Sequence, residues 1–165
     1  MGRRREARQR AVQFLFQYDL NRPEDLEKEL EEFWRTQNTA ALADEKNRRA
    51  SAPIEETIPT AEAAAIRLFA EPLIRGTIEH QDELDELIKK YVKNWNFNRI
   101  AVVDRNVLRL AIFEMLYRED IPPIVSINEA VDIAKRFSTE ESGRFVNGIL
   151  DQVRAELLRP ARTAK

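Results

Sequence analysis

The sequence of 165 residues contains no cysteine, one histidine and four glycines. The lack of cysteine excludes disulfides, thiolate metal sites and a cysteine nucleophile. Neither a GxxxxGK[ST] nor a GxGxxG motif is present, so no glycine-rich loop is predicted to hold nucleotide phosphates. No apolar run approaches the roughly 18 residues that a membrane-spanning helix needs. We therefore expect a cytoplasmic protein that makes no contact with a membrane.

The single histidine, His80, offers little for chemistry. It lies among the acidic and amide residues of segment 79–83, with no HExxH motif, and an exposed position within a helix is expected. A metal site built on His80 would need carboxylates from other helices, which is uncommon for a lone histidine. The acidic runs at 83–86 and 140–141 are explained by solvation and by helix first turns. We expect no catalytic residue, metal or cofactor, and hence a binding protein, not an enzyme.

The composition favours an all-α fold. Charged residues make up 34% of the chain and apolar residues 43%, which together with the scarcity of glycine suits packed helices better than a sheet. A chain of 165 residues usually forms one domain with a substantial core. Six or seven helices are expected, in an early group and a later group.

Charge is sorted along the chain although the net charge is only −2. Five arginines in the first ten residues face a single acid, Glu6: Arg3, Arg4, Arg5, Arg8 and Arg10. Guanidinium groups at the start of a helix pair well with phosphate oxygens, and such binding weakens steeply with salt. A solvated basic tail is the other interpretation, and the pattern alone does not decide between them.

The first helix is expected over residues 4–20, with a core stripe of Ala7, Ala11, Phe14, Leu15 and Tyr18. Beside that stripe, Arg5, Gln9, Val12 and Phe16 form a second row at spacings of three and four. An aromatic ring at the edge of a basic face can stack on a base. From spacing alone, a wider buried face is the favoured interpretation of Phe16.

The middle of the chain gives weaker patterns. Pro23 is suited to the first position of a second helix, and residues 36–59 lose apolar periodicity, which predicts a mobile surface insertion with a short helix near 40–48. After a cap at Thr60, apolar residues recur on one helix face to about residue 91. This pattern predicts a single long helix bent at Pro72. Within it, Gly76 marks a weak point or a close helix contact.

A central helix is expected over residues 100–118, capped by Asn96 or Asn98, because its apolar residues lie almost all round. After it, residues 125–153 predict a helical hairpin of two amphipathic helices. Two capping boxes, each with a serine followed by a glutamate three residues on, mark the helix starts. They are Ser126 with Glu129 and Ser138 with Glu141.

Three segments at the ends and centre of the chain carry a known pattern: RRREARQRAVQFLFQYDL, LIRGTIEHQDELDELI and VVDRNVLRLAIFEMLYREDIPPIVSINEAVDIAKRFSTEESGRFVNGILD. Together they resemble the NusB family of bacterial transcription antitermination factors. The most specific pieces are IFEMLY, INEAVDIAKRF and FVNGILD, and residues 36–59 lie outside the resemblance.

The resemblance implies an all-α helical bundle of about seven helices in a single domain, 1–165. Two small subdomains are implied, about 1–75 with the mobile insertion 36–59, and about 76–160. By the same resemblance, the protein binds boxA RNA with NusE, a small-subunit ribosomal protein. As part of the RNA polymerase antitermination complex it promotes read-through of terminators in ribosomal RNA operons. Some relatives are monomers and others homodimers, so self-association is a further expected interaction.

The resemblance also implies site residues. The RNA-binding set is Arg4, Arg5 and Arg8 with their neighbours Arg3 and Arg10, together with Phe16, Asp104 and Phe145; the partner-binding residue is Glu141. Glu6 stands where some members have another arginine, and Phe16 stands where others have tyrosine, which keeps stacking but loses a phenol hydrogen bond. Asn147 is implied to lock the hairpin to a neighbouring helix, and Gly148 to permit close approach.

Two alternatives stay open. One is a non-catalytic interaction module whose basic N-terminus is incidental and whose closing hairpin binds a protein. The other is a methyltransferase-associated domain, which the chain disfavours because it carries no cofactor-binding domain and no cysteine. If the RNA-binding reading holds, Phe145 and the turn at Glu141 extend the arginine surface, with the first helix beside the hairpin.

Overall fold

The computed structural model describes the backbone of residues 3–48, 61–92 and 97–158, and their side chains apart from those of 38–48 and 158. Within these ranges the chain forms seven α-helices, one 3-10 turn and no strand, which confirms the predicted all-α fold. The elements are α1 (Arg3–Leu20), α2 (Leu26–Arg48), α3 (Ala61–Glu79), α4 (Gln81–Tyr91), η1 (Phe97–Arg99), α5 (Val102–Tyr117), α6 (Pro123–Phe137) and α7 (Glu140–Leu158).

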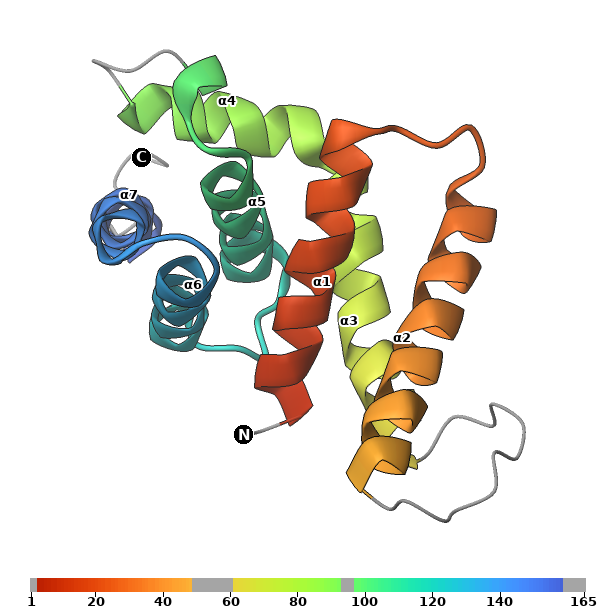
Figure 1. The fold of residues 1–165 in the computed structure, drawn as a ribbon. Helices are drawn as coiled ribbons and strands as arrows, with labels where there is room; N and C mark the ends of the chain where they lie inside the picture. Colours follow the sequence, from red (N-terminus) through yellow and green to blue (C-terminus); the bar gives the residue numbers. More distant parts are fainter. Residues whose placement is uncertain (1–2, 49–60, 93–96, 159–165) are drawn as a thin grey trace.

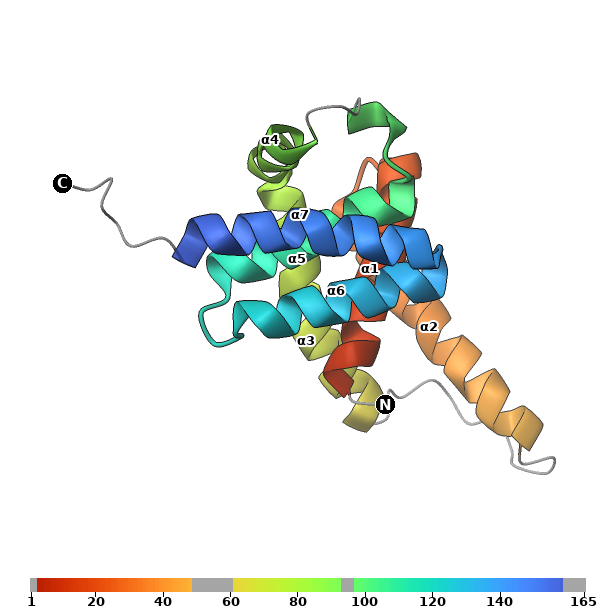
Figure 2. The same ribbon diagram turned by 90° about the vertical axis from the view of Figure 1, so that its left-hand side faces the viewer.

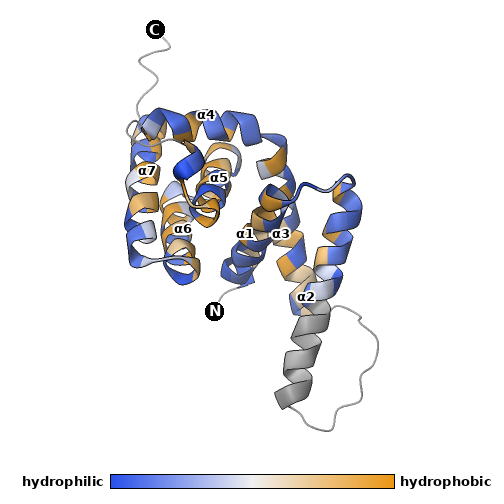
Figure 3. Ribbon diagram, turned by 45° about the horizontal axis from the view of Figure 1, so that its top comes forward, coloured by the Kyte–Doolittle hydropathy of each residue, from blue (hydrophilic) through white to orange (hydrophobic). Residues whose placement is uncertain are grey.

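The bundle is built around α5, against which α1, α3, α4, α6 and α7 all pack (Figure 1). The helices α6 and α7 form the predicted hairpin, which lies along one side of α5 (Figure 2). On the other side α1 packs against α3, and α2 lies outside that pair. The apolar faces of the helices turn toward one another, and the hydrophilic residues gather on the outer faces (Figure 3).

The central position of α5 explains its unusual sequence. Ten of its 16 residues are buried, and four of these are polar or charged: Asp104, Asn106, Arg109 and Glu114. A helix covered on several sides has no solvent-exposed face for such residues, so each needs a hydrogen-bond or ion-pair partner inside the protein. The prediction of a helix covered on several sides is confirmed.

The second helix differs from the prediction at both ends. Pro23 precedes α2, and the Asp25 carboxylate caps the helix by accepting a hydrogen bond from the Lys28 backbone N–H at 3.2 Å. The helix also continues without a break to Arg48, so the prediction of an irregular chain is wrong for residues 36–39, whereas the short helix predicted near 40–48 is the last part of α2. Loss of apolar periodicity signals an uncovered helix as well as a loop. Residues 49–60, including the proposed cap Thr60, lie outside the described residues.

The prediction of one long helix over residues 60–91 is also wrong, because α3 ends at Glu79 and α4 begins at Gln81. At the break the His80 ring stacks on Tyr117, with 4.3 Å between ring centroids, and Phe113 lies 5.9 Å away. Helix α3 continues without a break at Pro72. Gly76 of the same helix is a close helix contact, because a Cβ there would lie 2.0 Å from Cζ of Phe113.

The hairpin forms without the two predicted capping boxes. Because α6 begins at Pro123, Ser126 lies inside the helix and donates instead to the Glu114 carboxylate at 3.0 Å. The start of α7 is capped by Thr139, whose Oγ1 accepts from the Ser142 backbone N–H at 2.9 Å. Serine and threonine serve either role, so the local pattern misplaced the cap by four residues at α6, where it is Pro122, and by one residue at α7.

Three smaller expectations are also revised. The residue before α5 is Ala101, because Asn98 belongs to η1, and Asn96 lies outside the described residues. Asn147 is exposed, and a Cβ at Gly148 would meet nothing within 4 Å, so neither residue brings a neighbouring helix close. The predicted boundary between residues 75 and 76 falls inside α3, and the division into two subdomains stays a prediction.

Candidate nucleic-acid interface

The first turn of α1 carries the arginine fringe, by which we mean the exposed residues Arg3, Arg4 and Arg5. The Arg5 guanidinium donates to Glu129 of α6 at 2.7 Å and to Asp132 at 3.1 Å. The hydrogen bond and charge of Glu129 raise the pKa of Arg5 above its ordinary value. These contacts confirm that the first helix lies beside the hairpin, and they give the Arg5 side chain a fixed direction while 43% of it stays exposed.

Arg8, one turn further along α1, lies inside the protein and is only 3% exposed. Its Nε and Nη2 donate to the two carboxylate oxygens of Glu114, at 2.9 and 2.8 Å. The same carboxylate accepts from Ser126, and Glu129 lies 3.6 Å from Arg8. Arg8 therefore joins α1 to α5 and α6, and its guanidinium is covered in this structure.

The remaining arginines of the predicted set differ in their surroundings. Arg4 lies over the Phe69 ring of α3, with its Cζ atom 4.8 Å from the ring centroid. Arg10 lies 3.8 Å from Glu6 on the same helix. Arg3 is exposed at the helix start. The five arginines thus divide into three at the surface, one buried, and one partly covered and paired with its neighbour.

Asp104, at the start of α5, is 6% exposed and accepts a hydrogen bond from the Ser142 hydroxyl of α7 at 2.9 Å. Its other carboxylate oxygen, Oδ1, has no hydrogen-bond partner among the described residues. Burial raises the pKa of Asp104, and the bond from Ser142 opposes that rise only in part. A buried acceptor without a donor costs free energy, and Oδ1 is covered in this structure, as the Arg8 guanidinium is.

The other predicted residues lie toward this end of the molecule. Helices α1 and α5 run antiparallel, since Arg8 meets Glu114 near one end and Asp19 meets Arg105 near the other. Phe16 is half-buried on α1, about 17 Å along the helix from Arg5 at 1.5 Å per residue, and so lies toward the Asp104 end. Half-buried Phe145 and exposed Glu141 flank Ser142 on α7.

The structure thus gathers the predicted residues into two groups. One is the arginine fringe beside α6, and the other lies where α5 and α7 begin and comprises Asp104, Glu141 and Phe145. Phe16 lies on α1 between them, on the helix row that begins with Arg5. The roles of all these residues in binding RNA or a partner stay predictions.

A second charged network, which no local sequence pattern predicted, joins the other end of α1 to α4 and α5. We call it the α1–α5 clamp; it comprises Asp19, Asp85, Arg105, Asn106 and Arg109. The Asp19 carboxylate accepts from Arg105 at 3.0 Å, Asn106 at 3.1 Å and Arg109 at 3.0 Å, and Arg109 also donates to Asp85 at 2.6 Å. Burial raises the pKa of Asp19, but the hydrogen bond from Arg105 and the charge of Arg109 outweigh it, so the pKa lies below its ordinary value.

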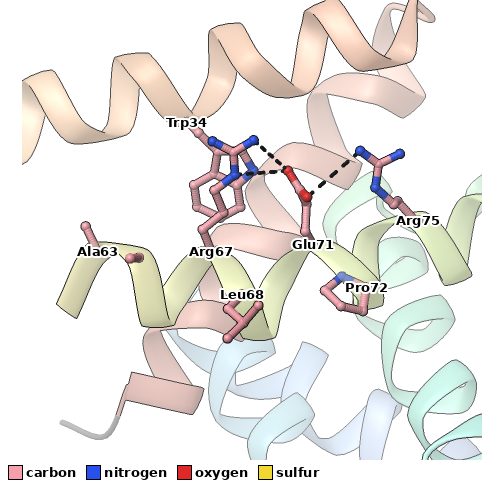
Figure 4. Close-up of a pocket in the computed structure, with 8 residues that line it drawn as sticks. Trp34, Ala63, Arg67, Leu68, Glu71, Pro72 and Arg75 are labelled. Atoms are coloured by element: carbon pink, nitrogen blue, oxygen red, sulfur yellow. Dashed lines mark hydrogen bonds and ion pairs between the residues drawn. The ribbon is translucent and has the colours of Figure 1, made fainter. Parts of the chain in front are cut away.

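A groove of about 540 Å³ lies between α2 and α3, away from these residues (Figure 4). Arg67, Glu71 and Arg75 line it as a row of alternating charges, with 3.1 Å from Arg67 to Glu71 and 3.9 Å from Glu71 to Arg75. Trp34 of α2 forms its wall, and Leu68 is 78% exposed beside it. No local sequence pattern indicated this groove, because it depends on how Trp34 of α2 lies against α3.

Within the described ranges, no three or more His, Asp or Glu side chains converge in a way that would hold a metal ion. Among the helices of those ranges, none combines the length and the apolar character needed to cross a membrane.

An all-helical bundle whose first helix carries a fringe of exposed arginines defines a class, the small helical proteins that bind anionic partners. Residues 5–155 match the model of the NusB family. The chain therefore belongs to the NusB family.

Individual relatives agree with that assignment. The chain is 42% identical over 161 residues to the transcription antitermination protein NusB of Thermodesulfovibrio yellowstonii, with 93% of each chain covered. It is 41% identical to the solved structure of T. maritima NusB, with a TM-score of 0.68, covering 93% of this chain and 91% of that one. A structure of the antitermination factors NusB and NusE in complex with dsRNA is 27% identical, with a TM-score of 0.66 and coverage of 92% and 95%.

Proposed function

We propose that this protein is a non-catalytic, cytoplasmic RNA-binding transcription antitermination factor. It binds boxA-type RNA together with NusE and promotes read-through by RNA polymerase in ribosomal RNA operons. Membership of the NusB family supports this proposal, as does the similarity to a NusB that is solved in complex with NusE and dsRNA. The observation that carries it is the arginine fringe, whose Arg5 is oriented by Glu129 and yet 43% exposed.

In this proposal the arginine fringe binds the RNA backbone, and the second group of residues, at the starts of α5 and α7, recognises the bases. Guanidinium groups form bidentate hydrogen bonds with phosphate oxygens, and orienting them before binding reduces the entropy lost on binding. Phe16 and Phe145 offer half-buried rings for base stacking. The Oδ1 atom of Asp104, which is covered in this structure, accepts from a base amino group once RNA binding uncovers it, and exposed Glu141 contacts the protein partner. Arg8 acts indirectly, by fixing α1 on α5.

The test is a mobility shift with boxA RNA at two salt concentrations, with and without NusE. The double variant Arg4→Ala with Arg5→Ala is expected to weaken binding and to reduce the slope of log affinity against log salt by about 1.4, since each lost phosphate contact to a single strand contributes about 0.7. The matched control is Arg67→Ala with Arg75→Ala, which removes two arginines from α3. Equal binding by wild type and the fringe variant at both salt concentrations would contradict the proposal.

The second candidate is a protein interaction module with an incidental basic N-terminus. It is favoured by the ion pairs of Arg5, which is already held by two carboxylates of α6. This candidate predicts that NusE alone forms a tight complex, and that boxA RNA neither strengthens nor weakens it. Cooperative tightening of the three-component complex would exclude the second candidate.

A further inference from the structure

Three arginines, two from α1 and one at the end of α5, lie around one aromatic ring. The Cζ atoms of Arg4, Arg8 and Arg118 lie 4.8, 5.2 and 5.4 Å from the centroid of Phe69 on α3. Arg118 follows Tyr117, the last residue of α5. Like charges repel, so a cluster of this kind needs neighbouring anions.

The nearby carboxylates are shared unevenly among the three arginines. Glu114 pairs with Arg8 inside the protein, and both side chains are less than 5% exposed. Asp120 pairs with Arg118 at 3.0 Å, but 55% of the Asp120 side chain is exposed. Arg4 forms no ion pair with any described residue, although its charge helps the Arg118 hydrogen bond to hold the pKa of Asp120 below its ordinary value. One arginine is thus unpaired, and a second is paired with an acid at the surface.

The guanidinium groups of the three arginines each lie over the Phe69 ring. A guanidinium group that lies over an aromatic ring keeps its N–H groups available at its edge. Both Arg4 and Arg118 lie over this ring, so their guanidinium carbons are at most about 10 Å apart. That upper limit places both forks within reach of one short stretch of RNA backbone, where each can pair with phosphate oxygens.

We propose that Arg4 and Arg118 form a phosphodiester-binding site on Phe69, in which an RNA phosphate replaces Asp120 on Arg118. This inference rests on the RNA binding proposed above and extends the binding surface to the end of α5. Arg118 is a binding residue, Phe69 is a positioning residue, and Asp120 competes with the phosphate. The site lies on the α3 side of α1, whereas Arg5 lies on the α6 side.

The test measures the affinity of the full chain for boxA RNA over a salt titration. Arg118→Gln is expected to weaken binding about fivefold and to reduce the salt slope by about 0.7. Phe69→Leu is expected to weaken binding about threefold with no change in slope, because it removes orientation and no charge, and Phe69→Tyr is expected to restore it. Asp120→Asn is expected to tighten binding about threefold, because the competing carboxylate is lost.

Two controls separate local effects from general charge effects. Arg75→Gln removes an arginine of similar exposure on α3, and Glu32→Gln removes an exposed acid that is paired with Arg35. Circular dichroism and thermal unfolding verify that each variant is folded, and Arg118→Lys, which keeps the charge but loses the fork, is expected to bind with intermediate affinity.

The outcomes distinguish this inference from the function on which it rests. If the wild type shows no salt-dependent binding of boxA RNA, the proposed function is wrong and the site is wrong with it. If the wild type binds and the double variant at Arg4 and Arg5 does not, but Arg118→Gln and Asp120→Asn match their controls, the function stands and this site is excluded. A weaker Arg118→Gln together with a tighter Asp120→Asn supports the site.

Discussion

The two ends of α1 both carry arginines paired with carboxylates, yet the pairs differ in exposure and in balance. In the α1–α5 clamp the side chains of Asp19, Asp85 and Arg109 are 15% exposed or less, and each charge meets an opposite one. At the other end, Arg5 and Asp132 are 43% and 51% exposed, the second partner Glu129 is 12% exposed, and Arg4 forms no ion pair with a described residue.

This difference separates charges that maintain the fold from charges that are available to a ligand. A buried pair cannot exchange partners without exposing an uncompensated charge, whereas an exposed arginine exchanges a carboxylate for a phosphate at little cost. Arg8 shows that position in the sequence does not decide the matter. It belongs to the basic segment, but its burial with Glu114 groups it with the clamp.

The largest expected effect tests that grouping. Glu114→Ala leaves the Arg8 guanidinium buried without its partner, which should lower the free energy of unfolding by about 3–5 kcal/mol. Urea unfolding followed by circular dichroism measures this change. Replacing both residues, as Arg8→Met with Glu114→Leu, should recover much of the loss, because no buried charge remains. A loss below about 1 kcal/mol for Glu114→Ala would show that Arg8 reaches solvent.

The α1–α5 clamp should contribute slightly less to the free energy of unfolding than the buried pair of Arg8 and Glu114. Asp19→Asn weakens the hydrogen bonds from Arg105 and Arg109, and we expect a loss of about 2 kcal/mol at neutral pH, typical of hydrogen bonds to a charged group.

The charge of Asp19 should also make the stability of the fold depend on pH. The folded-state pKa of Asp19 lies below the ordinary value of 3.8, so the stabilisation is present above that value and is lost as the pH falls through the folded pKa. Urea unfolding of wild type and Asp19→Asn across acidic pH should therefore converge below pH 3.8. A constant difference would exclude the charge as its source.

Asp104 should behave in the opposite way. Its pKa is raised by burial above the ordinary value of 3.8, so its contribution to stability is greatest below that value and is lost as the pH rises through the folded pKa. Asp104→Asn should therefore stabilise the protein by about 1 kcal/mol at neutral pH, measured by thermal unfolding, with little difference in acid. A less stable variant at neutral pH would contradict this account.

The smallest effect on stability is expected at the arginine fringe. Arg5→Gln removes an exposed pair, which contributes at most about 1 kcal/mol to folding, while RNA affinity should fall and its salt slope should decrease by about 0.7. Urea unfolding and a mobility shift on the same preparation measure both quantities. A large loss of stability without a loss of RNA binding would place Arg5 with the clamp and not with the interface.

Apolar periodicity predicted much of the fold because it records which face of a helix is buried. The core stripe of α1, the covered helix α5 and the α6–α7 hairpin all followed from it. It failed where the decisive interaction is distant in sequence. The break at His80 depends on the ring of Tyr117, and the extension of α2 to Arg48 occurs without apolar periodicity.

The residue types of the candidate site were predictable from the sequence, but the exposure of each side chain was not. The arginine cluster was evident from the sequence, whereas the burial of Arg8 depends on Glu114, 106 residues further along, and the role of Ser126 depends on the same carboxylate. Spacing within one helix reports a shared face and does not reveal what covers that face. The unpaired Oδ1 of Asp104 and the cluster on Phe69 likewise depend on packing between helices.

The pairing of α1 with α5 and α6 sets an order of events during synthesis. Arg8 meets a residue made 106 positions later, and Arg5 meets one made 124 positions later. A ribosome adds about 5–20 residues per second, so the amino-terminal helix waits several seconds for the segments that fix its arginines. A nascent chain that has not yet produced α6 therefore has the basic sequence but not the oriented surface, and the finished protein gains that surface only when its last third has emerged.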